Sequence, residues 1–378
     1  MKIAHVMPRY GPGGGIVRIV RETARRLTSH GYQIEVFTAV TGEATTEAGP
    51  TSSAAVTVRQ FPYGRSRRVH FPLLVGLDGA LSDCNADVIH AHNHRYGHVL
   101  QAARVAHRRQ IPLVVSTYYH PAQRRETLAK KGAIRMLDIA FGLVAYERAG
   151  ALVALTRHEA ELLRRFAPSP PIHVVPPGID VSVWGNAAAD LPVAGLPPAY
   201  FLYAGRIART KGIEHLLSAV ARIPPAVRRP LLLVGPDMGA REPLEARARA
   251  LGIARDVRFL GLVPDDRTYR GIVRHASALI LPSEWESFGI VLLEAMAART
   301  PVIGSRVGAI PEVLDEGRAG RLVDYGDAQG LAEALTAVEG EPAATRLQVA
   351  HAFDRASALD WETATDRLRA VYEGVVHR

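Results

Sequence analysis

The chain has 378 residues, a hydrophobic fraction of 48% and a formal net charge of +9. This length predicts two domains, because single hydrophobic cores stop growing at roughly 250 to 300 residues. The composition excludes two classes of protein: no apolar run reaches the roughly 20 residues of a membrane-spanning helix, and the one cysteine, Cys84, excludes an intrachain disulfide framework and a multi-cysteine metal site.

The positive charge is confined to the first half of the chain. Residues 1–180 carry 23 Lys and Arg against 13 Asp and Glu, a net charge of +10, and the remainder carries −1. This asymmetry indicates an anionic partner, which could be nucleic acid, an anionic membrane surface or an anionic substrate. Because the first residues lack the pattern of a signal peptide, we expect a cytoplasmic protein, either free or peripheral to the inner face of the membrane.

The first predicted element is a buried strand at residues 2–7, followed by a glycine-rich turn and a helix at residues 16–30. Strand, glycine-rich turn and helix open a doubly wound α/β domain of the Rossmann type. Gly14 and Gly15 in that turn let backbone N–H groups approach a phosphate or a sugar closely. The turn is not a dinucleotide fingerprint, because Arg18 stands where the last glycine is required.

Further strands are predicted in the first half at residues 33–38, 56–61, 87–92, 113–117, 151–155 and 173–175. They alternate with helical segments, so the first domain is expected to contain a parallel sheet of six or seven strands. Sheets of this kind bind ligands at the carboxyl ends of their strands.

Histidines gather at the ends of two of these strands. His90 and His92 point to the same face of their strand, yet no carboxylate or thiolate nearby completes a ligand set, so we predict no metal site. Such histidines more commonly form hydrogen bonds in the core or line the ligand-binding edge. His120 follows the next strand and precedes Pro121, so it either lines that edge or packs as a turn residue.

A basic segment spans residues 124–148. Its basic residues lie near its start and apolar residues at helical spacing follow, which predicts a basic amphipathic helix. Such a helix either lies on an anionic membrane or presents an ordinary solvated face. The later stretch rich in proline and glycine is predicted to link the domains.

The second domain is predicted to contain strands at residues 200–204, 231–235, 257–260 and 278–281. Arg206 and Lys211 stand in the turn between the first of these strands and a helix. Two cations at a helix N-terminus oppose the helix dipole unless an anion binds there, so the pair is a candidate clamp for a diphosphate. Val263 follows the third strand, where backbone groups could hold a base.

Two carboxylates bracket the start of a further predicted helix. Glu286 follows the strand before it, and Glu294 lies about two turns into the helix on roughly the same side. A buried Glu294 without a partner would be costly, so a ligand hydroxyl is its expected partner. Anions or sugar oxygens could also bind the first backbone N–H groups of the helix, those of Phe288, Gly289 and Ile290.

The run from Glu286 to Glu294, ESFGIVLLE, resembles the E-x7-E motif of retaining nucleotide-sugar glycosyltransferases of family 4. The likeness includes Pro282-Ser283 before it, PVI at 301–303 and GAIPE at 308–312, and it covers nearly the whole chain. It implies the GT-B fold, an α/β architecture of two doubly wound Rossmann-like domains that face a central cleft.

The resemblance also implies an activity. An enzyme of the hexosyltransferase type would move a sugar, with retention, from a nucleoside diphosphate sugar to a hydroxyl of a lipid-linked or small-molecule acceptor. Glu294 would bind the ribose, Glu286 the sugar, and His120 would touch the transferred sugar. Arg206 and Lys211 would stabilise the departing diphosphate. Because the chain contains no Asp-x-Asp pair, we expect neither a metal nor a cofactor.

The expected layout is an acceptor-side domain at residues 1–180, a linker at 181–198, a nucleotide-sugar-binding domain at 199–358 and a helix at 359–378 that crosses back to the first domain. Two alternatives stay open. A sugar-nucleotide epimerase or hydrolase of the same fold needs acid and base carboxylates in the first domain, where none stands out. A nucleic-acid-binding protein rests only on the basic first half, which lacks interleaved aromatic residues, so no nucleic acid is expected as a partner.

Overall fold

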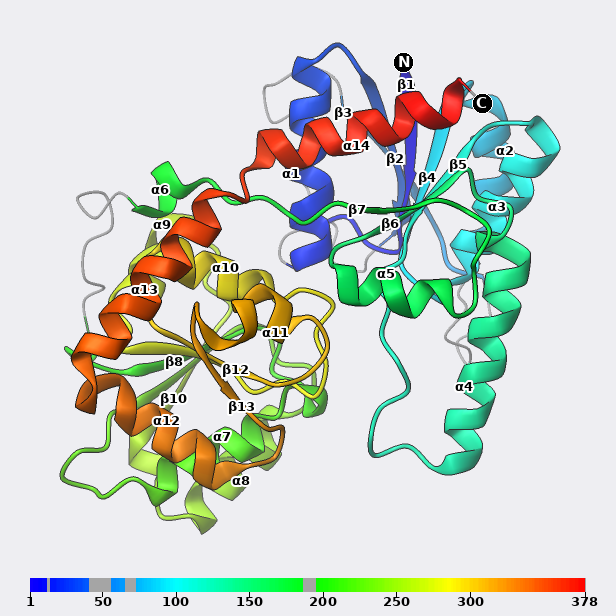
Figure 1. The fold of residues 1–378 in the computed structure, drawn as a ribbon. Coiled ribbons are helices and arrows are strands. Elements are labelled where there is room, and N and C mark those ends of the chain that lie inside the picture. The colour runs from blue at the N-terminus through cyan, green and yellow to red at the C-terminus, as the bar shows by residue number, and fades with distance from the viewer. Residues whose placement is uncertain (12–13, 41–55, 65–72, 186–194, 378) are drawn as a thin grey trace. The chain divides into compact units, whose positions relative to one another are not determined.

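The chain folds into two compact units in a computed structural model, which describes residues 1–11, 14–40, 56–64, 73–185 and 195–377 (Figure 1). Unit 1 comprises Met1–Gly178 and Trp361–Arg378, and unit 2 comprises Ile179–Asp360. Each unit contains one parallel sheet with the strand order of a doubly wound fold. The predicted pair of Rossmann-like domains is thereby confirmed.

The sheet of unit 1 has the strand order β3-β2-β1-β4-β5-β6-β7. Its strands are β1 Lys2–Val6, β2 Gln33–Ala39, β3 Val56–Phe61, β4 Val88–His92, β5 Leu113–Ser116, β6 Ala151–Ala154 and β7 Ile172–Val174. All seven predicted strands are present, with ends shifted by one residue in most cases. The order runs outward from β1 on one side and from β4 on the other, so the carboxyl ends of these two strands flank a topological switch point.

Helices cover both faces of this sheet. They are α1 Gly15–Ser29, α2 Leu77–Asp83, α3 Gly97–Arg109, α4 Leu128–Phe141, the π-helix η1 Gly142–Tyr146, α5 Arg157–Arg164 and α14 Trp361–Val376. Because strand side chains alternate between faces, Ile3 packs with α1 and α14, whereas Ala4 packs with α2 and α3. The last helix, α14, lies beside α1 (Figure 1), and Arg26 on α1 donates to Glu362 on α14 over 3.1 Å.

The sheet of unit 2 has the order β10-β9-β8-β11-β12-β13. Its strands are β8 Phe201–Ala204, β9 Leu231–Val234, β10 Val257–Gly261, β11 Ala278–Leu281, β12 Val302–Ser305 and β13 Arg321–Val323. The strands β12 and β13 were not predicted, because β12 ends in Gly304-Ser305 and β13 begins with Arg321, so neither is a continuous apolar run. The switch point of this sheet lies between β8 and β11.

The helices of unit 2 are α6 Val181–Gly185, α7 Ile213–Arg222, α8 Arg241–Ala250, α9 Asp266–Arg274, α10 Ile290–Ala297, α11 Ile310–Val313, α12 Ala328–Gly340 and α13 Pro342–Ser357, with short 3-10 turns η2 Arg209–Lys211, η3 Ala254–Asp256 and η4 Asp315–Gly317. The helix α6 lies in the stretch predicted as a linker. Its Trp184 is buried, so this part of the stretch is anchored in unit 2.

The predicted basic helix at residues 124–148 is shorter than expected. The helix α4 begins only at Leu128, because Thr127 caps it by accepting a hydrogen bond from the backbone N–H of Lys130. It gives way to the π-helix at Gly142. Among the helices that the structure describes, none is both long enough and apolar enough to cross a membrane.

Candidate active site

The switch point of unit 2 brings Lys211 and Glu286 together. Lys211 lies in the turn after β8 and Glu286 in the turn after β11, and Lys211 Nζ is 2.6 Å from Glu286 Oε1. Ser283 Oγ donates to the same carboxylate oxygen over 2.7 Å. The two charged side chains retain 14% and 15% of their exposure, so a ligand at this edge of the sheet can reach both ends of the ion pair.

Two glycines allow the surrounding loops to approach this closely. Gly212 has a φ of 65°, and a Cβ atom there would lie 2.0 Å from the carbonyl oxygen of Pro282. Gly308 has a φ of 53°, and its Cβ would lie 2.3 Å from the carbonyl oxygen of Glu286. A side chain at either position would therefore push the loop away from the turn that carries Glu286.

Arg206, the other cation of the predicted clamp, follows β8 and is exposed. The Tyr203 hydroxyl donates to the Arg206 carbonyl oxygen over 2.8 Å. Burial raises the pKa of Tyr203 well above its usual value, and the charge of Glu286 adds to this shift, so Tyr203 remains a neutral donor. Within the described part of the chain, the Arg206 guanidinium has no hydrogen bond or ion pair, so it can bind an anion without losing a protein partner.

The start of α10 lies directly after these groups. Gly289 precedes the helix with a φ of 87°, and no side chain caps the helix. Phe288 is buried beneath it, whereas Ile290 is half-buried. Gly289 has no side chain with which to accept from the first backbone N–H groups of α10, and these are the groups that a bound anion or sugar oxygen would contact.

Glu294 has a protein partner that was not predicted from the sequence, and a contact with a ligand hydroxyl stays a prediction. The residue is 4% exposed, and the Tyr269 hydroxyl on α9 donates to Glu294 Oε2 over 2.7 Å. Spacing within one segment could not reveal a partner on another helix. Its role toward a ribose remains a prediction.

Val263 lies between β10 and α9 and is half-buried. The strand β10 is at the edge of the sheet, two places from β8. Val263 therefore shares the carboxyl edge with Arg206 and Glu286, and the proposed contact with a base remains a prediction.

In unit 1, Gly14 and Gly15 lie at the corresponding edge, after β1. Both are exposed. Gly14 has a φ of 94°, and no side chain caps the start of α1. Gly13, the other glycine of this predicted close-approach turn, lies outside the described residues.

His120 is exposed in the turn after β5. Arg95, which follows β4, has its Nη2 atom 3.0 Å from His120 Nδ1 and its Nη1 atom 3.4 Å from Asp138 Oδ1. Neither Arg95 nor Asp138 was predicted from the sequence as a site residue. The available signal was one charged residue at the end of a strand and one carboxylate within the apolar run MLDIAF.

The histidines predicted to be free of metal form a buried cluster. The potential ligand atoms of His5, His90 and His92 lie within 4.8 Å of one another, and desolvation lowers the pKa of His5 to about 4. The rings of His5 and His92 stack with an interplanar angle of 20°, and Nδ1 of His5 lies 2.8 Å from Nε2 of His92. Five of the six ring nitrogens have hydrogen-bonding partners. His5 Nδ1 and His92 Nε2 pair with each other, both nitrogens of His90 pair with the Tyr372 and Ser116 hydroxyls, and His92 Nδ1 pairs with the Tyr118 hydroxyl. The arrangement fits a hydrogen-bonded core, and the absence of metal stays a prediction.

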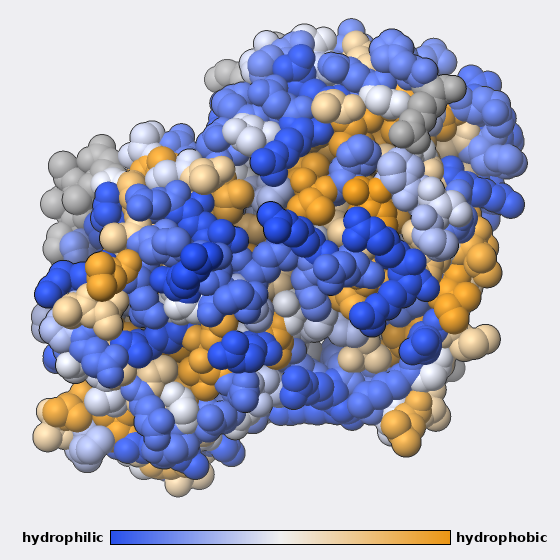
Figure 2. All heavy atoms as spheres, in the orientation of Figure 1, coloured by the Kyte–Doolittle hydropathy of each residue, from blue (hydrophilic) through white to orange (hydrophobic). Residues whose placement is uncertain are grey.

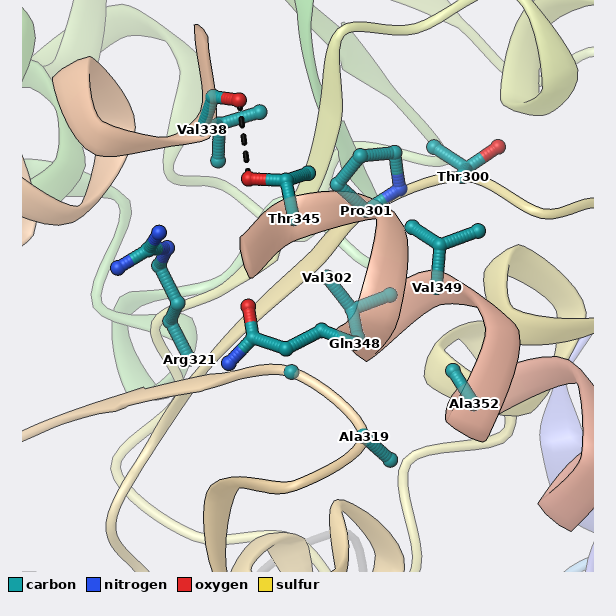
Figure 3. A pocket seen from close by; sticks show the side chains of 11 residues that line it. Thr300, Pro301, Val302, Ala319, Arg321, Val338, Thr345, Gln348, Val349 and Ala352 are labelled. Atoms are coloured by element: carbon teal, nitrogen blue, oxygen red, sulfur yellow. Dashed lines mark hydrogen bonds between the residues drawn. The ribbon is translucent and has the colours of Figure 1, made fainter. Parts of the chain in front are cut away.

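A small hollow in unit 2 lies away from these residues, against β12, β13 and α13 (Figure 3). Thr345 Oγ1 donates across it to the Val338 carbonyl oxygen over 3.0 Å. Its free volume of about 10 Å³ is near the minimum for a single water molecule. It is too small for a sugar or a nucleotide.

Comparison with known proteins assigns the chain to a family. The pattern of the family described as "Glycosyltransferase Family 4" matches residues 13–183, and that of "Glycosyl transferases group 1" matches residues 193–354. The chain is similar to D-inositol 3-phosphate glycosyltransferase 1 of Catenulispora acidiphila, with 32% identity over 98% of this chain and 93% of the relative.

Solved structures show the same fold. Sucrose-phosphate synthase from Thermosynechococcus elongatus superimposes with a TM-score of 0.77 and 23% identity, covering 98% of both chains. The Anabaena protein HepE, solved in complex with UDP-glucose, gives a TM-score of 0.77 and 18% identity, again over 98% of both chains. Both likenesses extend over the two Rossmann-like units and support the GT-B fold. The chain belongs to the family 4 glycosyltransferases, and it is a glycosyltransferase enzyme.

Proposed function

We propose that this enzyme transfers a sugar from a nucleoside diphosphate sugar to an acceptor hydroxyl, with retention at the anomeric carbon. The observation that supports this proposal most strongly is the 2.6 Å contact between Lys211 and Glu286 at the switch point of unit 2, beside the exposed cation Arg206. Ligands of doubly wound sheets bind at such points. HepE, whose structure was solved with UDP-glucose, supports a donor of this class.

The ion pair of Lys211 and Glu286 favours binding of a ligand that has both an anionic group and hydroxyl groups. Lys211 and Glu286 neutralise each other, so a simple anion would meet a carboxylate as well as an ammonium group. A nucleoside diphosphate sugar satisfies both, because its diphosphate accepts hydrogen bonds from Lys211 and its sugar hydroxyls donate to Glu286. Arg206 adds a second donor to the diphosphate.

The proposed chemistry uses these contacts at the leaving group. As the bond between the anomeric carbon and the diphosphate oxygen breaks, negative charge develops on the diphosphate. Lys211 and Arg206 stabilise that charge, so they take the role that a metal ion plays in other sugar transferases. The backbone N–H groups at the start of α10 would hold sugar oxygens, Glu294 the ribose, and Val263 the base.

In unit 1, His120 would contact the transferred sugar, and Gly14 with Gly15 would let the backbone approach the reaction centre. Retention follows from the family resemblance. Membership of a glycosyltransferase family favours transfer over the epimerase or hydrolase alternative.

The acceptor is a small molecule or a lipid-linked group. A phosphorylated polyol is the first small candidate, because the relative from Catenulispora acidiphila is named for D-inositol 3-phosphate. A lipid acceptor draws support from α4 and η1, where Figure 2 shows apolar and hydrophilic side chains side by side on the lower right. The exposed apolar residues there are Leu128, Met136, Ile139, Leu143 and Val144.

The test is a transfer assay with UDP-, GDP-, ADP- and dTDP-sugars, in the presence and absence of polyol phosphates and lipid extracts. We expect acceptor-dependent release of one nucleoside diphosphate, with the anomeric configuration of the donor kept in the product by NMR. Turnover of a donor to its epimer without acceptor, or an inverted product, would overturn the proposal.

A further inference from the structure

The side chain of His120 is held by a buried arginine. Arg95 Nη2 lies 3.0 Å from His120 Nδ1 and also donates to the His120 carbonyl oxygen. Arg95 is 8% exposed, whereas His120 is exposed. We infer that Arg95 and Asp138 are positioning residues that keep the His120 imidazole in the tautomer with its proton on Nε2, presented as a donor to a sugar oxygen.

The tautomer follows from what a guanidinium can do. Arginine carries only N–H donors, so a contact with Arg95 requires Nδ1 of His120 to accept. A competing contact at the same atom is the Pro121 carbonyl oxygen, 3.4 Å from Nδ1, which would require a proton there. The Arg95 contact is shorter and charge-assisted, and a proton on Nδ1 would face the cation. The ring proton therefore resides on Nε2.

Asp138 fixes Arg95 in turn. Its side chain is 8% exposed, and its Oδ1 atom lies 3.4 Å from Arg95 Nη1 and 2.7 Å from His94 Nε2. Desolvation lowers the pKa of His94 to about 4, so His94 is neutral and donates to the carboxylate without cancelling its charge. Arg95 supplies the compensating charge, which a buried carboxylate requires.

The surrounding hydrogen bonds leave Asp138 little freedom. The Tyr119 hydroxyl is 3.2 Å from Asp138 Oδ2, and the Tyr146 hydroxyl is 2.5 Å from His94 Nδ1. Tyr146 lies in the π-helix η1, whose wider turn is unusual in globular proteins and common near functional sites. This network fixes the position of Asp138, the partner of Arg95, on α4.

Arg95 also lies in an unfavourable backbone conformation. Arg95 has a φ of 59°, in the left-handed region that favours glycine and costs other residues about 1 kcal/mol or more. Asn93 before it and Tyr118 near His120 have φ values of 83° and 45°. These positions flank the carboxyl ends of β4 and β5, where a strained backbone commonly accompanies function.

The consequence rests on the proposed function, in which His120 contacts the transferred sugar. With its proton on Nε2, His120 donates to a sugar oxygen and does not act as a base toward it. Arg95 and Asp138 have no other proposed contact with the substrate. They therefore act on transfer only through His120.

The first experiment reads the tautomer directly, without substrate. Two-bond ¹H–¹⁵N spectra of the full chain with labelled histidine at pH 8 would be recorded for the wild type, for His120→Gln to assign the His120 signal, and for Arg95→Met. We expect the Nε2–H pattern for His120 in the wild type and a mixed pattern in Arg95→Met. An Nδ1–H pattern in the wild type, or an unchanged pattern in Arg95→Met, would overturn the inference.

The second experiment is a double-mutant cycle on transfer. We expect His120→Ala and Arg95→Met each to lower kcat about 10-fold, the size of one lost hydrogen bond, and the double variant to be no slower than His120→Ala. Arg26→Met is the matched control, since Arg26 is equally buried in unit 1 and pairs with Glu22 and Glu362 instead. Its effect should combine multiplicatively with that of His120→Ala.

The outcomes separate the two claims. If His120→Ala slows transfer but the Arg95 and His120 effects multiply, the positioning role is wrong and the proposed function stands. If His120→Ala leaves transfer unchanged, the role of His120 in the proposed function is wrong, and so is any link of Arg95 to transfer.

Discussion

At the scale of single residues, Glu286 and Glu294 differ in what holds them. Glu286 shares its Oε1 atom with Lys211 and Ser283 at the edge of the sheet, whereas Glu294 is buried against Tyr269. In the proposed function Glu286 would respond to charge that develops during transfer. Glu294 would bind a group that does not change during the reaction.

This difference predicts distinct kinetic effects. Glu286→Gln should mainly lower kcat, because contacts with the sugar tighten in the transition state, whereas Glu294→Gln should mainly weaken nucleotide binding. Steady-state kinetics and calorimetric titration of both variants provide the check. Identical changes in kcat and in nucleotide affinity for the two variants would contradict the assignment.

A second prediction for single residues concerns the cations Arg206 and Lys211. Arg206→Ala and Lys211→Ala should each lower kcat by about 10²- to 10³-fold, the loss typical of one electrostatic donor at a charged transition state. Arg209→Ala, which removes an exposed arginine from the same turn, is the control and should cost much less. Activity should survive EDTA. Complete loss on chelation, restored by manganese, would show that a metal does this work.

At the scale of elements, the turn between β8 and α7 depends on Gly212. Gly212→Ala places a Cβ 2.0 Å from a backbone oxygen of Pro282 at a φ of 65°, so unit 2 should lose about 2 kcal/mol or more of its free energy of unfolding. Gly340→Ala in α12 is the control, because a Cβ there meets nothing within 4 Å. It should be neutral or stabilising by up to about 1 kcal/mol. Denaturant titration compares the two, and equal stabilities would refute the steric account.

The hypothesis of membrane binding concerns the segment formed by α4 and η1. Lys130 pairs with Glu126 over 2.7 Å and Lys131 donates to the Arg124 carbonyl oxygen over 2.9 Å, so the basic charge is partly engaged locally. Each basic residue near an anionic membrane contributes about 1 kcal/mol, within a Debye length of roughly 8 Å at physiological salt. We expect the protein to sediment with anionic vesicles at low salt and not with neutral ones.

Two variants divide this binding between charge and apolar contact. Changing Arg124, Arg125, Lys130 and Lys131 together to Gln should abolish sedimentation and leave nucleotide binding intact. Changing Leu128 and Met136 to Ser should weaken it at all salt concentrations. If the wild type fails to sediment at about 20 mM salt, where screening extends beyond roughly 20 Å, a soluble acceptor becomes the better proposal.

The buried histidines of unit 1 should make the stability of that unit depend on pH. His5, His90, His92, His94 and His98 are buried, and desolvation lowers the pKa of each below its ordinary value near 6.5, to about 4 for His5, His94 and His98. The unfolded chain then binds more protons below pH 6.5, so stability should be full above that pH and fall from about pH 6.5 toward pH 4. Hydrogen exchange resolved by unit measures this, and a unit 1 that is equally protected at pH 7.5 and pH 4.5 would contradict it.

At the scale of the whole molecule, the sequence predicted the fold well because parallel strands are continuous apolar runs bounded by turns. Most of the seven strands of unit 1 and of the four strands predicted in unit 2 were found in this way, whereas β3 is VTVRQF, in which polar and apolar residues are mixed. The short strands β12 and β13 and the helix α6 were missed. Their identity depends on neighbours distant in sequence, such as the strand beside β12 or the core around Trp184.

The candidate site was predicted less completely, for the same reason. Arg206, Lys211, Glu286 and the start of α10 carry local signals, but no local pattern could show that Lys211 pairs with Glu286. Likewise the partner of Glu294 is on α9, and the anchor of Arg95 is on α4. Contacts between elements are what the fold adds to the sequence.

The proposed function requires that unit 2 bind a nucleoside diphosphate through Arg206 and Lys211. Calorimetric titration of the wild type and of Arg206→Ala, Lys211→Ala and Arg209→Ala with UDP, GDP, ADP and dTDP tests it most directly. We expect at least one nucleotide to bind, which at 100 times its Kd would stabilise the protein by roughly 2.7 kcal/mol. Its affinity should fall about 10-fold or more in Arg206→Ala and Lys211→Ala, the loss of one charge-assisted hydrogen bond, and stay unchanged in Arg209→Ala. Binding of no nucleotide, or an equal loss in Arg209→Ala, would contradict the account.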